Sequence, residues 1–518
     1  MYDIDRIHRD IMSSFAPETA TWHPKRLSLY LSCFIAYLAP IQNSSIDKLF
    51  IILSLHPSDR LIQIDTSAVL ANLSNVAHAR KHIQRCSHTS TLLINMTRWS
   101  HEETVQTELC AILSNLAQSE SENGDLARAG ACELLRDAMT RHTESEDLQV
   151  QALNALAGLA RSAKRVLPET TMRMHVAGVL AVLDAWTVRA SMATCAAACN
   201  ALGVFSFAGV RVPCVATAEG SVLRAMQKFR ACAKFQVTAC FALAHLCICV
   251  NEGGGTLGVE LVDEVLAIMS SFPRHKNVLT TAAFALGSFA LQSDTNRTHI
   301  MTKKGIDIVV KSMMETEFDE EVNCLEVCMK HMTVSGEPTD GENEVDGNYL
   351  GSNNKPTQKS HLLKLFGSMF LMNLSENEKC RQEIIKRGGL DAIFDAASYI
   401  FQTSQSKDLG FVLMYNAVLR DLKSNFDSQK PIFFDLAQQI SDNLAEMQVP
   451  ENVRYSLSHH VECKRCGVLF DVITSITGHE VYGKDKPTVT RFCGRVCLDI
   501  FDKDSRKTVH KVEPCFDV

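Results

Sequence analysis

The chain has 518 residues, of which 46% are hydrophobic, and its formal net charge is −7. This hydrophobic content is typical of a folded protein and excludes extended disorder, and the negative charge balance gives no electrostatic support for nucleic-acid binding. The longest apolar runs, such as Cys247–Val250, are far shorter than a membrane span.

The chain begins with a polar leader over residues 1–24 that contains Pro17 and Pro24. The Leu- and Phe-rich stretch over residues 26–38 predicts the first helix of a helical array. As a terminal helix we expect it to keep one face polar.

A short segment of small and apolar residues then recurs along the chain, at the spacing of an α-helix with a buried face. It is clearest over residues 108–117, which read ELCAILSNLA. The last apolar residue of each copy is Leu73, Leu116, Leu159, Phe205, Leu246, Phe289, Leu374 or Leu419. The steps are 43, 43, 46, 41, 43, 85 and 45 residues, and we interpret the long step as two periods with a degenerate copy near residues 325–332.

A period of this length is typical of stacked helical repeats, in which neighbours must pack together to bury a continuous core. The sequence therefore predicts an all-α solenoid over residues 25–333 and 361–447. Between these parts, residues 334–360 are rich in acids, Gly and Asn and almost free of aliphatic residues. We expect them to form a disordered loop.

The repeats resemble those of the armadillo family, in which an Ala-Leu-x-Asn-Leu-Ala helix is the third of each repeat and lines a concave groove. A second helix that starts at a Gly is also typical of that family. Segments of this kind begin here at Ala129-Gly130, Ala177-Gly178, Lys304-Gly305 and Gly388-Gly389. HEAT repeats are the close alternative, and the Gly-started second helix favours armadillo.

The resemblance implies that the Asn of the third helix faces the groove and holds the backbone of a partner peptide. The matching residues are Asn72, Asn115 and Asn373, and the other role open to them is to satisfy helix-end or loop backbone groups. The equivalent positions elsewhere hold Gly158, Val204, His245, Ser288 and Val418. His245 is a candidate groove residue, and core packing is the other role for it. A Trp four residues before the Asn marks nuclear-import receptors, and its absence here argues against that function.

The chain has 19 Cys residues, and most of them fall inside predicted helices. Free Cys acts as a small buried hydrophobe, so we expect these thiols to pack in the core of a protein from a reducing compartment, cytoplasmic or nuclear.

A different cysteine pattern lies after the repeats. The segment CKRCG contains Cys463 and Cys466, and FCGRVC contains Cys493 and Cys497. Two such pairs predict one closed, tetrahedral, structural Zn²⁺ site, with His479 as a substitute ligand. Strands are predicted at residues 468–472 and 488–492 and a helix at 493–501. The segment resembles a treble-clef finger of the TRASH or MYM type, which implies a small α+β zinc domain over residues 455–510 and a tail over 511–518.

Two functions remain open. The first is a non-enzymatic scaffold whose groove binds partner proteins, with the zinc finger as a second contact. The second is a substrate-recruiting adaptor of a ubiquitin-ligase or other modifying complex. The C-terminal region has too few ligands for the two zinc sites of a RING ligase. No nucleophile–base pair, phosphate-binding loop or open metal site is recognisable, so we expect neither an enzyme nor a small-molecule substrate.

Overall fold

The computed structural model describes residues 43–85, 88–118, 123–210, 215–248, 259–315, 318, 356–403, 418, 422, 479–482, 489–492 and 512–514. The chain forms two compact units, Met1–Ile268 with Val322–Asn343, and Met269–Glu321 with Glu344–Val518. The helix predicted at 26–38 and nearly all of 404–447 lie outside the described residues.

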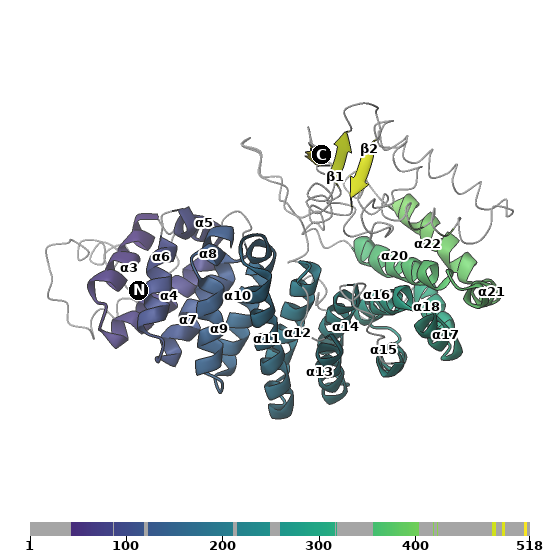
Figure 1. Cartoon of the computed structure of the whole chain (residues 1–518), viewed down its shortest axis with the longest axis horizontal. Coiled ribbons are helices and arrows are strands. Elements are labelled where there is room, and N and C mark those ends of the chain that lie inside the picture. Colours follow the sequence, from purple (N-terminus) through teal and green to yellow (C-terminus); the bar gives the residue numbers. More distant parts are fainter. Residues whose placement is uncertain are drawn as a thin grey trace, which may run out of the picture. The chain divides into compact units, whose positions relative to one another are not determined.

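The first unit is built of helices that follow one another in chain order (Figure 1). They are α3 (Asn43–Leu55), α4 (Arg60–Ser74), α5 (Ala77–Arg85), α6 (His88–Arg98), α7 (Glu103–Leu116), α8 (Asn123–Arg128), α9 (Ala131–Arg141), α10 (Glu146–Val166), α11 (Glu169–Arg189), α12 (Met192–Phe207), α13 (Val215–Lys228) and α14 (Ala233–Ile248). A further helix, α15 (Val259–Ser271), crosses the division between the two units.

The third helix of each repeat packs against the third helix of the next. Helix α4 contacts α7, α7 contacts α10, α10 contacts α12, and α12 contacts α14. In α7 the buried stripe includes Val105, Leu109, Ile112 and Leu116, which share one side of the helix. The shorter helices α5, α6, α8 and α9 pack against this layer. This is the predicted helical-repeat architecture.

A residue in the left-handed backbone conformation precedes the second helix of three repeats. Gly130 (φ 89°) precedes α9, Lys304 (φ 62°) precedes α18 (Gly305–Met314), and Gly388 (φ 73°) precedes α22 (Gly389–Thr403). Three of the predicted second-helix starts are therefore present.

The fourth predicted start, at Ala177-Gly178, is wrong. Both residues lie inside α11, which runs without a break from Glu169 to Arg189. A glycine in a helix costs only about 1 kcal/mol, and the neighbouring helix formers here carry the backbone ladder through it. In this repeat the single long helix α11 takes the place of the two shorter helices, α8 and α9, of the preceding repeat.

A buried glutamine near the start of the third helix binds the end of the second helix. Gln149 in α10 donates from Nε2 to Met139 O (2.7 Å) and His142 O (3.1 Å). Carbonyls in the last turn of a helix have no donor within that helix, and a side chain can supply one. We call this contact the helix-end clamp. The same bond, to the carbonyl ten residues earlier, joins Gln63 to Leu53 O (2.9 Å), Gln106 to Met96 O (2.8 Å) and Gln236 to Met226 O (3.0 Å).

The clamp glutamines lie nine residues before the position of the motif Asn in their helices. At this position of α20, Lys364 donates to Met313 O (3.2 Å) in the last turn of α18. The Oε1 atoms of Gln63, Gln149 and Gln236 are buried and accept no hydrogen bond from the described part of the chain, so these amides act there as donors. The same position is Cys195 in α12, whose thiol lies 3.9 Å from Leu183 O inside α11, and the apolar Leu279 in α16.

The second unit contains α16 (Lys276–Gln292), α17 (Asp294–Thr302), α18, α20 (Pro356–Leu374), α21 (Glu378–Lys386) and α22. Helix α16 packs directly on α20. The rings of Phe284 and Phe366 stack with centroids 4.6 Å apart, and Asn373 Nδ2 donates to Gly287 O (2.9 Å).

The degenerate copy near residues 325–332, with which we interpret the 85-residue step, lies outside the described residues. In the described part, α17, α18 and α20 pack together as the three helices of one repeat, next to α16.

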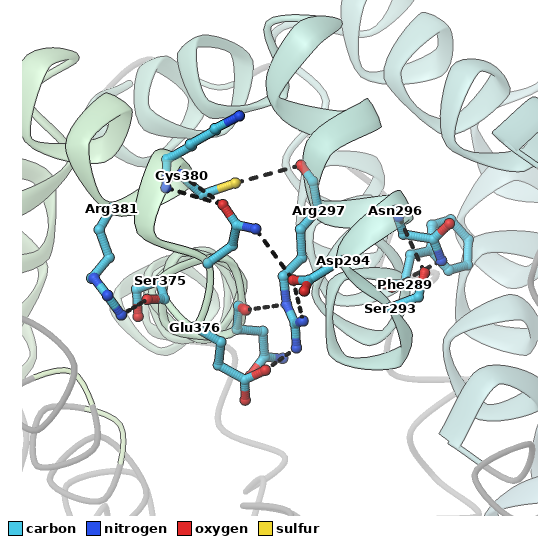
Figure 2. Close-up of polar contacts among 12 residues, drawn as sticks. Phe289, Ser293, Asp294, Asn296, Arg297, Ser375, Glu376, Cys380 and Arg381 are labelled. Carbon is cyan, nitrogen blue, oxygen red and sulfur yellow. Dashed lines mark hydrogen bonds and ion pairs between the residues drawn. The ribbon is translucent and has the colours of Figure 1, made fainter.

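Arg297 on α17 joins the two ends of that repeat (Figure 2). Its side chain is only 11% exposed; Nε donates to Asn373 O (3.1 Å), and the guanidinium pairs with Asp294 (2.9 Å) and Glu376. The thiol of Cys380 donates in turn to Arg297 O (3.7 Å). Helix α17 is thus fastened to the end of α20 and the start of α21.

Three short strands are described near the C-terminus: β1 (His479–Tyr482), β2 (Val489–Phe492) and β3 (Val512–Pro514). They form an antiparallel sheet in the order β2-β1-β3, with His479 opposite both Phe492 and Pro514. Strand β2 coincides with the strand predicted at 488–492. The strand at 468–472 and the helix at 493–501 lie outside the described residues.

The cysteines of the repeats are core residues, as predicted. Cys110, Cys195, Cys199, Cys240 and Cys247 are buried, and Cys232 is half-buried. Burial raises the pKa of the Cys110 and Cys240 thiols to about 12, so neither is a thiolate at neutral pH. Among the described helices, none is long and apolar enough to cross a membrane.

Glu219 on α13 gives a pH-dependent test of this fold. Glu219 is only 6% exposed, and burial raises the pKa of its carboxyl from 4.5 to about 7. The folded chain therefore holds a proton that the unfolded chain loses, so this contribution to stability is complete below about pH 4.5 and is lost as pH rises through about 7. We predict that Glu219→Gln raises the free energy of unfolding by about 1–3 kcal/mol at pH 8 and changes it little at pH 4.

Urea denaturation at the two pH values, followed by circular dichroism, measures this difference. An equal effect of Glu219→Gln at both pH values would contradict the burial of an uncompensated carboxyl.

Candidate functional site

The stacked third helices of the first unit present a strip of half-exposed side chains, which we call the third-helix face. Within each helix its residues are three or four positions apart, so they share one side. They are Ile64, Ala68 and Asn72 on α4, Glu108, Ala111 and Asn115 on α7, Gln151, Asn154 and Gly158 on α10, and Ala196 on α12. Most of them are small or neutral.

The sequence-predicted asparagines occupy this face in two different ways. Asn72 is exposed near the end of α4. Asn115 is half-buried; its Nδ2 donates to Ala71 O (3.2 Å) and Ser74 Oγ (2.9 Å) of α4, and its Oδ1 accepts from Gln118 (3.3 Å). Asn115 therefore ties its own repeat to the preceding one, which is the second of the two roles that the sequence left open.

Asn373 in the second unit repeats the contact made by Asn115. It is 8% exposed and donates to Gly287 O of α16, at the position that Ala71 occupies in α4. Because the same donor meets the equivalent carbonyl in both units, we assign the bond to repeat stacking. A partner peptide would compete for these two amides, whereas Asn72 is accessible.

Gly158 holds the equivalent Asn position in α10, and its lack of a side chain has a packing reason. A Cβ atom there would lie 2.7 Å from Ala117 Cβ and 2.9 Å from Ala117 O. An Asn would collide with the end of α7, so the interruption of the Asn series at this repeat follows from a closer helix approach.

His245 lies in the core of the unit. It is 2% exposed, and its ring meets Phe207 and Phe241 edge-on, with centroids 5.4 and 4.7 Å away. Burial lowers the pKa of His245 to about 3, which keeps the imidazole neutral. In this conformation a bound peptide does not reach the imidazole ring, and the role of His245 is packing.

Two charged side chains near the third-helix face, Glu108 and Arg80, are partly buried. Burial raises the pKa of Glu108 and lowers the pKa of Arg80. Arg80 donates to Ser74 O (3.4 Å) at the end of α4 and to Gln118 Oε1 (3.1 Å). Arg381 makes the same bond to Ser375 O (2.9 Å) in the second unit. These basic groups serve helix ends and do not form a basic patch.

The predicted zinc ligands Cys463, Cys466, Cys493 and Cys497 lie outside the described residues, and only the backbone of His479 is described. Strand β2 ends at Phe492, the residue immediately before Cys493.

Two sets of residues escaped the sequence reasoning. The clamp glutamines Gln63, Gln106 and Gln149 recur at the 43-residue period, so the periodicity contained a signal for them. A cluster of Asp47, His82 and His88 is formed by three different helices. No local spacing connects Asp47 to the two histidines.

The packing of the described helices defines the chain as a helical-repeat protein. No protein-family model and no curated protein matches it. A crystal structure of an engineered protein is 19% identical, with a TM-score of 0.30 over 55% of this chain and 94% of that one.

Another solved structure comes from a study of a phosphorylation switch in the interaction between cadherin and beta-catenin. It is 11% identical, with a TM-score of 0.45 over 84% of this chain and 95% of that one. At these values neither likeness adds to what the helix packing defines.

The different settings of Asn72 and Asn115 lead to a paired prediction. Asn115→Ala should lower the free energy of unfolding by about 1 kcal/mol, because it removes hydrogen bonds between repeats. Asn72→Ala should change it by less than about 0.5 kcal/mol, as an exposed substitution does. Leu116→Ala, a truncation of a fully buried side chain, should cost about 2–5 kcal/mol. Urea denaturation of the three variants gives the order, and equal effects of the two Asn substitutions would contradict it.

Proposed function

We propose that the chain is a non-enzymatic scaffold that binds a partner protein along the third-helix face. The observation that supports this most is the continuity of that face: α4, α7, α10 and α12 contact one another in series, and each contributes half-exposed residues to it. Solenoids characteristically bind partners on extended surfaces of this kind.

The side chains on the face suit an extended peptide. Asn72 and Asn154 are exposed or half-exposed, and their amides make no hydrogen bond to other described residues. An amide offers both a donor and an acceptor, which match the C=O and N–H of a peptide backbone. The half-exposed small residues Ala68 and Ala111 belong to the same face and leave room for a backbone to approach.

A partner protein fits the electrostatics better than a nucleic acid does. The net charge of the chain is −7, and Arg80 and Arg381 are occupied by helix-end carbonyls. The described residues of the third-helix face include no Lys or Arg, so the face offers no cation to a phosphate backbone.

We further propose that Cys463, Cys466, Cys493 and Cys497 hold one structural Zn²⁺ that supports a second contact surface. The support is the spacing of the two Cys pairs and the strand that ends directly before Cys493. Four thiolates complete a closed tetrahedral shell, and such an ion stabilises a small domain without taking part in chemistry.

Substitutions on the face test the scaffold function. Ala111→Arg and Asn154→Arg place a long cation on half-exposed positions of α7 and α10, and Thr140→Arg adds the same cation to an exposed position of α9. When the full chain is used to capture proteins from lysates of cells that express it, we expect the two face variants to lose proteins that the wild type and Thr140→Arg retain. The loss should be at least about tenfold, because a buried clash or unpaired charge costs more than about 1.4 kcal/mol.

Unchanged helix content by circular dichroism shows that the face variants remain folded. Retention of the same proteins by all four chains would contradict binding through this face.

Removal of the zinc should affect only the C-terminal segment. Structural zinc sites are worth apparent free energies of ~10–16 kcal/mol, and a segment of this size has little apolar core of its own. We predict that Cys493→Ser lowers the zinc content of the protein by one equivalent, makes the segment after residue 450 sensitive to protease and leaves the melting of the helical repeats unchanged. Zinc content equal to that of the wild type would contradict the site.

A further inference from the structure

A second cluster with metal-binding chemistry lies at the opposite end of the sequence, in the first described repeat. It consists of Asp47 on α3, His82 on α5 and His88, the first residue of α6. These residues come from three helices, and the two histidines are 35 and 41 positions from Asp47. In the part of the chain that the structure describes, it is the one group of three or more such side chains whose ligand atoms lie within 4.8 Å of one another.

The geometry of the three side chains converges on one point. The Nε2 atoms of His82 and His88 each lie 2.7 Å from the same oxygen, Asp47 Oδ1. The ring of Phe50 stacks on His88 with centroids 4.1 Å apart and the planes parallel to within 1°, which restricts the turning of that imidazole. Two imidazoles and a carboxylate are thus aimed at a common position by fixed helices.

The burial of the cluster leaves one side open. The side chains of His82 and His88 are 14% and 16% exposed, whereas that of Asp47 is 42% exposed. The carboxylate is therefore the part of the cluster most open to solvent, the side from which an ion and a completing water molecule would approach.

We propose that Asp47, His82 and His88 bind one divalent transition-metal ion, Zn²⁺ by preference, with water as the fourth ligand. Two imidazole nitrogens and a carboxylate oxygen are a donor set that suits Zn²⁺, with bonds of ~2.0–2.2 Å. In a tetrahedral shell such ligand atoms lie ~3.3 Å apart. The ion therefore takes the place of the two short hydrogen bonds, and each N–O pair opens by roughly half an ångström.

The two states of the cluster differ in what joins the helices. Without metal, both imidazoles hydrogen-bond to Asp47 and link α5 and α6 to α3. With metal, Nε2 of each ring contributes a lone pair to the ion, which links the same helices more firmly. Zn²⁺ should consequently raise the melting temperature of the chain through this site, because it binds the folded form.

The test measures zinc in four forms of the full-length chain: wild type, Asp47→Asn, His88→Gln and His78→Gln. His78 is an exposed histidine one turn from His82 on α5, so His78→Gln is the matched control. After dialysis against Zn²⁺, we expect Asp47→Asn and His88→Gln to carry one equivalent less than the wild type and the control. Any zinc at the four C-terminal cysteines is common to all four chains and cancels in the difference. The affinity for that equivalent should fall by more than ~100-fold, since even residues behind the direct ligands are worth 10–100-fold.

A second measurement tests the site by the absorption spectrum of a bound metal ion. Asn at position 47 still accepts hydrogen bonds from both imidazoles, so helix content should be kept. After titration with Co²⁺, the spectrum of the wild type minus that of Asp47→Asn should show the weak visible absorption of a nitrogen–oxygen site, because thiolate absorption from the four C-terminal cysteines is common to both chains and cancels. Equal zinc content in all four chains, or no such Co²⁺ absorption in the difference spectrum, would overturn the assignment.

Discussion

The fold depends on how the second helix of each repeat ends. A helix leaves its last carbonyls without donors, and here those ends are buried against the third helix, where water cannot serve them. The amide of Gln149 supplies two hydrogen bonds from one buried side chain. At the same position of α20 the ammonium of Lys364 donates to the end of α18. Glutamine and lysine differ in charge but both supply the donor, whereas α16 has the apolar Leu279 there.

The clamp and the motif Asn position lie on opposite sides of the third helix. The clamp lies nine residues before the Asn position, so one side of the third helix is fixed in the core and the other remains half-exposed. Asn115 and Asn373 bind the preceding repeat from this position. Asn72 is exposed at the same position of α4. The same sequence position thus serves stacking in two repeats and remains accessible in α4.

Much of the fold follows from periodicity alone. The recurring apolar spacing predicted third helices at residues 108–117 and elsewhere, and the cysteines in the core, because both are local properties of an amphipathic helix. Predictions from periodicity were wrong where contacts between residues far apart in the sequence determine the local structure. Gly178 has the same sequence signal as Gly130, but only Gly130 adopts a left-handed conformation.

The site was less predictable than the fold for the same reason. Spacing identifies the Asn positions, but whether Asn115 faces solvent or the preceding repeat depends on Ala71, more than forty residues away. His245 shares the motif position with Asn72, yet two phenylalanine rings cover it. Asp47 meets His82 and His88 only because three helices converge, and no pattern within any one of them indicates this.

The most direct measurement of this account is a comparison of Gln149→Met with Gln151→Met. Methionine has nearly the shape of glutamine but no donor, so at position 149 it leaves Met139 O buried without its partner, whereas Gln151 is half-exposed on the same helix. We expect Gln149→Met to lower the free energy of unfolding by about 1–3 kcal/mol and to speed amide hydrogen exchange in α9 and α10, while Gln151→Met stays within about 0.5 kcal/mol of the wild type. Equal stability and equal exchange in the two variants would contradict the helix-end clamp as the constraint on which the repeats depend.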